Sequence, residues 1–120
     1  MPFNADAVIP NAESAYVAPP KLRDYALNPD HPKGRHKARV FKSVLGFERD
    51  GWEDLRDQLL SGLMLANVAD IRVTYGGYSA EVPIEVTGPN GRTAVVVSGW
   101  YVADADPERR PSLATAYVDI

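Results

Sequence analysis

The side chains of this chain that could take part in chemistry are concentrated between residues 21 and 42. This stretch holds both histidines, seven of the thirteen Lys and Arg residues and two acids, whereas the 120-residue chain as a whole has a formal net charge of −3. Gathered cations favour an anionic ligand, because attraction to phosphate grows with the number of positive charges that face it. The same pattern is also typical of a solvated helix face.

His31 is the first candidate catalytic residue. It precedes Pro32, a residue type favoured at the first helical position, so we expect His31 to lie beside the free N–H groups of a helix start. A phosphate is stabilised at such a place, and an imidazole beside it could serve as general acid or base near neutral pH. The alternative is that His31 only caps the helix or fills a loop.

Lys37 is the second candidate catalytic residue, and the alternative is that its aliphatic stem lies along the helix surface. His36 is the weaker histidine candidate, because cations flank it on both sides. Three further cations are predicted to bind substrate: Lys33, Arg35 and Arg39.

Thr115 and Tyr117 extend the candidate catalytic set to the end of the chain. They are two residues apart in the predicted strand SLATAYVDI, so their side chains share one face, whereas Ala114 and Ala116 are predicted to face the helices. On an open sheet face the two hydroxyl side chains could bind a phosphate or stack beneath a base, and both are also ordinary strand formers. Trp100 is a third possible stacking group for the substrate, with burial in the core as the alternative.

The elements that must position these residues belong to one domain. Residues 1–20 contain four prolines and no sustained period, which predicts an extended arm or linker. Residues 21–120 are predicted to form a single α+β domain. Near its start, Leu22, Tyr25 and Leu27 fall on one side of a short turn or helix.

Two helices are predicted ahead of the strands. The first runs from Pro32 to Gly46, where glycine can end the helix in the left-handed conformation, and the second runs from about Trp52 to Leu65. Residues at every third or fourth position form the inward stripes, which are Ala38, Phe41, Val44 and Leu45 in the first helix and Trp52, Leu55, Leu59 and Leu63 in the second.

After Asn67 the hydrophobic period changes from helical to two. Residues 78–87 alternate and contain Pro83, which indicates an edge strand or a bulge. Asn90-Gly91 predicts a hairpin into a strand that is apolar on both faces and therefore central. With the last strand and a further one at 71–77, the predicted fold class is α+β, with N-terminal helices packed on one face of a three- to four-stranded antiparallel sheet.

Several function classes are excluded by what the sequence lacks. There is no cysteine, and with two histidines we expect no metal site and no cofactor. Glycine-rich phosphate loops and the HExxH and GxSxG patterns are absent. No apolar run approaches the ~18 residues of a membrane span, so no membrane partner is expected.

The segment KLRDYALNPDHPKGRHKARVFKSVLGF, followed by NGR, a tryptophan-bearing strand and PSLATAYV, resembles a small family of uncharacterised bacterial domains. Members of that family occur alone and at the C-terminal ends of large secreted or phage-related toxins. The resemblance covers roughly residues 21 to 118. The architecture is similar to that of the barnase, EndoU, colicin and RelE group of metal-independent ribonuclease toxins. It implies cleavage of RNA by attack of a 2′-hydroxyl on the adjacent phosphate.

The family's His-Pro falls on His31 and Pro32, its Gly-x-x-Lys-Ala on 34–38, and its Thr-Ala-Tyr on 115–117. The resemblance implies His31 as general base or acid, Lys37 and Arg35 holding phosphate, and Thr115 and Tyr117 completing the pocket. Two departures from the family pattern are VVVSG before the tryptophan and YVDI at the end.

The partners that this resemblance implies are RNA, with transfer RNA as one possibility, and an immunity protein or antitoxin. The implied location is the cytoplasm, or delivery as the C-terminal part of a secreted toxin. The alternative function is a non-catalytic protein-interaction module in a toxin–immunity or phage-derived system. The two differ in geometry, because a ribonuclease requires His31, Lys37 and Thr115 to meet around one concave patch.

Overall fold

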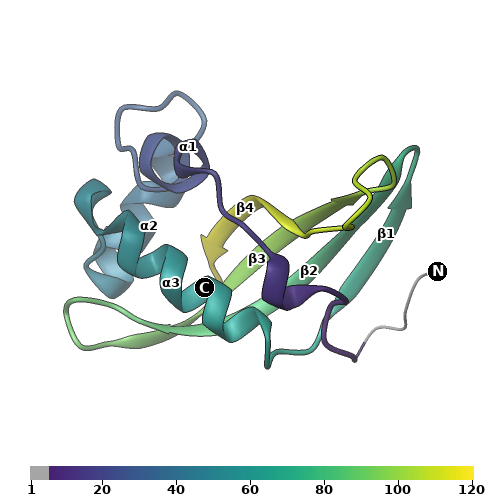
Figure 1. The fold of residues 1–120 in the computed structure, drawn as a ribbon. Helices are drawn as coiled ribbons and strands as arrows, with labels where there is room; N and C mark the ends of the chain where they lie inside the picture. The colour runs from purple at the N-terminus through teal and green to yellow at the C-terminus, as the bar shows by residue number, and fades with distance from the viewer. Residues whose placement is uncertain (1–5) are drawn as a thin grey trace.

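The computed structural model describes residues 6–120, and residues 1–5 of the predicted arm lie outside this range. Its framework is a four-stranded antiparallel sheet in the order β1-β2-β3-β4, a simple meander (Figure 1). The strands are β1 (Asp70–Thr74), β2 (Gly77–Thr87), β3 (Thr93–Ala103) and β4 (Ser112–Val118). The predicted α+β class and the central place of the strand apolar on both faces are confirmed.

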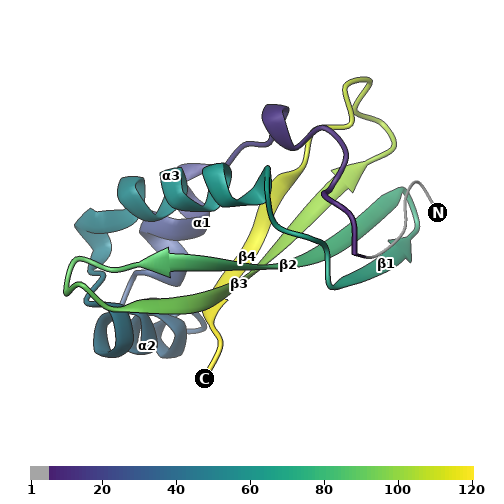
Figure 2. The same cartoon turned by 90° about the horizontal axis from the view of Figure 1, so that it is seen from below.

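The helical segments all precede the sheet in the chain. They are η1 (Ala12–Ser14), α1 (Pro19–Lys21), the π-helical turn η2 (Leu22–Ala26), α2 (Arg35–Leu45), η3 (Arg49–Gly51) and α3 (Trp52–Leu63). They gather toward the end of the sheet that carries the β2–β3 hairpin loop, and β1 lies at the other end (Figures 1 and 2). No helix within residues 6–120 is long and apolar enough to cross a membrane.

The start of α2 differs from the prediction. Regular helix begins at Arg35, and residues 32–34 form a turn that is closed by a hydrogen bond from Arg35 N–H to the His31 carbonyl, at 3.0 Å. Gly34 packs so closely on the backbone of Tyr25 that a Cβ atom would lie 2.1 Å from its carbonyl oxygen. The predicted end is confirmed, because Gly46 has φ 78°.

The second helix, α3, packs its apolar stripe against β2. Leu55, Leu59 and Leu63 are fully buried, as predicted. Trp52, the first residue of the predicted stripe, packs against the core but is only half-buried, with the guanidinium carbons of Arg23 and Arg56 at 5.9 and 5.1 Å from its ring centroid. Its place at the first position of the helix puts it at the domain rim, where two cations cover the ring.

Two irregularities in the sheet follow from particular residues. Pro83 lies beyond the last β1–β2 pair, Asp70 with Glu81, so its missing N–H removes no ladder bond to β1. Between β3 and β4 the register shifts at Gly99/Trp100, which leaves Ala114 as a bulged residue. Ala114 is therefore exposed, and its predicted orientation toward the helices is wrong.

Residues 6–20, predicted as an arm or linker, lie against the rest of the chain. Ile9, Ala12 and Val17 are buried in the same cluster as the sheet and helices. Tyr16 forms a single parallel bridge with Ser112 of β4. This segment therefore covers part of the core beside the edge of the sheet.

Candidate functional site

Lys37 lies in the first turn of α2 and reaches β4. Its Nζ donates hydrogen bonds to the hydroxyls of Tyr25 and Thr115, both at 2.9 Å, and lies 4.7 Å from the centroid of the Tyr25 ring. The side chain is half-buried. Among the described residues no carboxylate forms an ion pair with it, so two neutral oxygens hold an ammonium whose charge is not neutralised.

His31 also packs against Tyr25. The two ring centroids are 4.8 Å apart in an edge-to-face arrangement. The His31 Nδ1 atom accepts hydrogen bonds from the backbone N–H groups of Lys33 and Gly34, at 3.0 and 2.9 Å, so the ring caps the turn that leads into α2. A nitrogen that accepts two N–H groups carries no proton, and the neutral imidazole therefore holds its proton on Nε2.

Tyr25 connects the predicted catalytic residues. It contacts both His31 and Lys37, and Lys37 in turn binds Thr115, so the structure brings these three together from the loop before α2, from α2 and from β4. The sequence pattern places Tyr25 only on the apolar side of a short helix. The signal that could have identified it is its hydroxyl, because a tyrosine on an inward-facing stripe needs a hydrogen-bond partner for that group.

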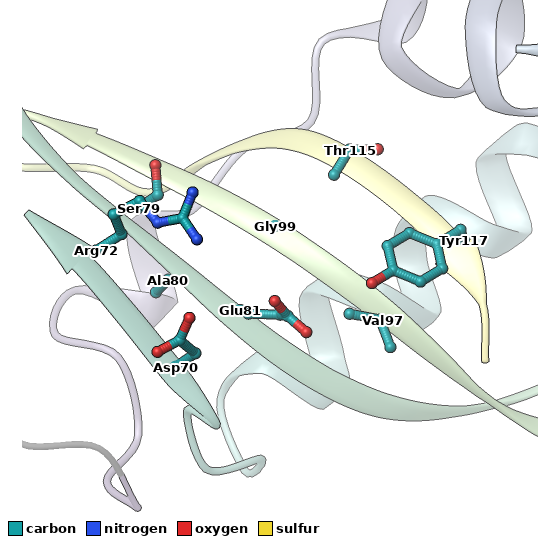
Figure 3. Close-up of a pocket in the computed structure, with 9 residues that line it drawn as sticks. All are labelled: Asp70, Arg72, Ser79, Ala80, Glu81, Val97, Gly99, Thr115 and Tyr117. Carbon is teal, nitrogen blue, oxygen red and sulfur yellow. The ribbon is translucent and has the colours of Figure 1, made fainter. Parts of the chain in front are cut away.

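Thr115 also borders a hollow of about 210 Å³ on the side of the sheet opposite to α3 (Figure 3). Tyr117 shares this face, as predicted, and its hydroxyl points across the sheet toward Glu81 and Val97 (Figure 3). Gly99 makes room at the centre, since a Cβ atom there would lie 3.1 Å from the Thr115 methyl group. The lining residues are Asp70, Arg72, Ser79, Ala80, Glu81, Val97, Gly99, Thr115 and Tyr117.

The predicted substrate-binding cations do not join Lys37. Arg35 and Arg39 line a second groove, of about 540 Å³, whose walls also include the buried Leu27 and Phe47. The Arg39 Nη2 atom lies 3.2 Å from Nδ1 of His36, and His36 lines the same groove. Lys33 is exposed and lines neither hollow.

Trp100 belongs to the core and not to the site. Its side chain is fully buried, and Nε1 donates to Ser98 Oγ at 2.8 Å, which in turn donates to the Val82 carbonyl at 2.7 Å. The predicted stacking of Trp100 on a substrate is therefore wrong, because its ring has no exposed face. The bulge at this point leaves Trp100 opposite the buried Leu113.

Within residues 6–120, no group of three or more His, Cys, Asp and Glu side chains is arranged to hold a metal ion.

Fold and site together define a small α+β domain whose N-terminal helices deliver a lysine to the edge strand of an antiparallel meander. Residues 8–120 match a family described as a domain of unknown function (DUF6883), and the chain belongs to this family. No curated protein matches the chain significantly.

Among solved structures, the fold is similar to a chain of a "contact-dependent growth inhibition toxin - immunity protein complex" from Klebsiella pneumoniae 342. The TM-score is 0.65, the sequence identity is 13%, and the match covers 93% of this chain and 99% of that chain. At this identity the likeness concerns the fold.

Proposed function

We propose that this protein is a metal-independent, ribonuclease-like toxin domain that cleaves RNA by attack of a 2′-hydroxyl on the adjacent phosphate. The observation that carries the proposal is the half-buried Lys37 ammonium, which is held by two hydroxyls and shares its neighbour Tyr25 with His31. In the part of the chain that the structure describes, no carboxylate is paired with this ammonium. An anion that binds there supplies the missing negative charge.

The reaction needs no metal or external reactant. The 2′-oxygen bonds to phosphorus, the bond from phosphorus to the 5′-oxygen breaks, and a proton passes overall from the 2′-oxygen to the 5′-oxygen. The products are a 2′,3′-cyclic phosphate and a 5′-hydroxyl end. Negative charge grows on the phosphate oxygens along the way, and a fixed ammonium in a partly dry site stabilises that charge most.

The geometry gives each side chain a distinct task in this proposal. Lys37 faces the developing charge, and Thr115 and Tyr25 fix its position. His31 presents its Nε2–H group as a donor to a phosphate oxygen or to the leaving oxygen. A general-base role for His31 is disfavoured, because the proton would have to move to Nδ1 and break two capping hydrogen bonds. Tyr117 flanks the neighbouring nucleotide on the open face of the sheet.

The fold comparison supports a place in a toxin–immunity system, since the similar structure is a complex of a toxin with its immunity protein. We accordingly propose an immunity protein or antitoxin as a protein partner. RNA, including transfer RNA, is the proposed substrate, in the cytoplasm of the producing cell or of a cell into which the domain is delivered.

The direct test is incubation of the purified protein with total RNA and transfer RNA in EDTA. We expect fragments with 2′,3′-cyclic phosphate ends, and a loss of about 10²-fold or more in rate for Lys37→Ala, the typical effect of removing one transition-state charge partner. Lys33→Ala is the matched control, because Lys33 is exposed and its side chain makes no hydrogen bond or ion pair among the described residues. Absence of cleavage by the unchanged protein at every dose would refute the proposal.

A second candidate function is a non-catalytic interaction module. It is favoured by one observation, namely that Arg35 and Arg39 line the larger groove with buried Leu27 and Phe47 and lie apart from Lys37. If the protein is a non-catalytic interaction module, Arg39→Glu should abolish binding to the cognate partner in a co-purification experiment, whereas Lys37→Ala should not.

A further inference from the structure

The hollow on the open face of the sheet is built from all four strands. Each strand turns alternate side chains to this face, and α3 packs against the other one. Asp70 and Arg72 come from β1, Glu81 from β2, Gly99 from β3 and Tyr117 from β4, which gives acceptors, a donor group and a ring around one small space (Figure 3). The volume of about 210 Å³ suits a single planar base.

The charged side chains of the hollow form no ion pair among the described residues. Asp70 and Glu81 stand directly opposite each other in the β1–β2 register, an arrangement that is unfavourable for two like charges. Arg72 is also in the lining, yet within residues 6–120 neither carboxylate forms an ion pair with it or with any other cation. A ligand that donates hydrogen bonds would relieve the repulsion between the carboxylates.

An aromatic ring closes one side of the space. Tyr117 is 38% exposed, its side chain makes no hydrogen bond among the described residues, and its ring lies beside Val97 over the sheet (Figure 3). Stacking of a base on an exposed aromatic ring strengthens binding and is tolerant of base identity. Selectivity must therefore come from the charged groups.

The charged groups match one base in particular. A carboxylate only accepts hydrogen bonds and can accept two parallel ones. Guanine is the base that offers two adjacent donors on one edge, N1–H and N2–H, and its O6 and N7 atoms are acceptors for a guanidinium such as that of Arg72. Adenine and cytosine offer one amino group, and uracil offers one imino group.

Thr115 fixes where the base lies relative to the phosphate. Its Oγ1 binds Lys37, while the rest of its side chain borders the hollow. The carboxylates of the hollow repel phosphate, so a nucleotide is oriented with its phosphate at Lys37 and its base on the sheet. Resting on the ribonuclease function proposed above, we infer that the open-face hollow is a base subsite that selects guanine next to the cleaved phosphate, with Glu81 as the specificity-determining residue.

The test measures binding of the four nucleoside 3′-monophosphates to the full-length protein by NMR titration. This measurement does not depend on RNA cleavage. We expect guanosine 3′-monophosphate to bind at least tenfold more tightly than the other three. Glu81→Gln should remove this preference by weakening guanosine binding about tenfold or more, as expected for loss of a bidentate contact. Glu85→Gln is the matched control, since Glu85 is exposed on the same face of β2 outside the hollow.

The outcomes separate the two proposals. Equal binding of the four nucleotides, no binding of any of them, or the same result for Glu81→Gln and Glu85→Gln overturns the guanine subsite. RNA cleavage without preference for guanine overturns the subsite and leaves the ribonuclease function standing. Selective guanosine binding without RNA cleavage supports the subsite and removes the nuclease. Tyr117→Ala should weaken all four nucleotides by a similar factor, whereas a selective effect would contradict its stacking role.

Discussion

At the scale of single residues, His31 combines a structural contact with a chemical one. Nδ1 caps the turn before α2, and Nε2 remains a donor for a ligand. His31→Ala should lower the free energy of unfolding by about 1 kcal/mol, the usual effect of removing a cap. His31→Asn should retain most of this stability, because the amide oxygen can accept the same backbone N–H groups. Urea unfolding of the two variants measures the difference.

RNA cleavage by the same pair of variants then isolates the imidazole. Both should lose activity if Nε2–H touches the phosphate, although only His31→Ala is destabilised. An asparagine variant that cleaves RNA at the rate of the unchanged protein would restrict His31 to capping.

At the scale of elements, the β2–β3 hairpin is held between the two long helices (Figure 2). Gln58 of α3 exchanges two hydrogen bonds with the backbone of Thr87, at 2.8 and 2.9 Å. On the other side, the Asn90 amide donates to the Val44 carbonyl at 3.1 Å and accepts from Arg92 N–H at 2.9 Å. The hairpin loop thus supplies a partner for a free carbonyl at the C-terminal end of α2.

Asn90→Ala should therefore lower the stability of the domain by about 1 kcal/mol, the net value of one or two partly exposed hydrogen bonds. It should also speed hydrogen exchange in the last turn of α2. Chemical unfolding and exchange measured by mass spectrometry provide the two readouts. Asn67→Ala is the control, since Asn67 is exposed and makes no side-chain hydrogen bond in the described part of the chain. Equal effects of the two substitutions would show that the loop does not cap the helix.

The elements themselves could be predicted because each carries a local signal. The three-to-four spacing that ends at Gly46 identifies α2, and the alternation around Pro83 identifies β2. The contacts that make the site have no such signal. Tyr25 and Lys37 are twelve residues apart, and Lys37 and Thr115 are 78 apart, so their meeting depends on how α2 docks beside β4. The bulge at Ala114 likewise arises from pairing between strands, which no single strand specifies.

At the scale of the whole molecule, the charges are separated by the sheet and its helices. Arg35, Arg39 and Lys37 lie on α2, whereas the open face carries the unpaired carboxylates of Asp70 and Glu81. In the function proposed above, the phosphate of a bound RNA would therefore lie at Lys37, away from these carboxylates. The formal net charge of −3 does not prevent this, because screening limits each phosphate to the charges within about 10 Å.

The stability of the domain should depend on pH through Asp24, a carboxylate of η2. Hydrogen bonds from Arg23 at 2.9 Å and Arg49 at 2.7 Å lower the Asp24 pKa from 3.8 to about 2 and tie η2 to η3. Because the folded-state pKa lies below the unfolded one, this carboxylate stabilises the fold above about pH 4, and the contribution is lost as the pH falls toward 2.

Asp24→Asn should accordingly be less stable than the unchanged protein at pH 6, and the two stabilities should converge between pH 4 and pH 2. Asp119→Asn is the control, because Asp119 is exposed and its side chain has no partner among residues 6–120. Urea midpoints measured across this pH range test the expectation. Since Asp24 is solvent-exposed enough for salt to weaken its ion pairs, the difference at pH 6 should also shrink in 1 M NaCl. Parallel curves for Asp24→Asn and the unchanged protein from pH 6 to pH 2 would mean that the Asp24 ion pairs do not couple η2 to η3 energetically.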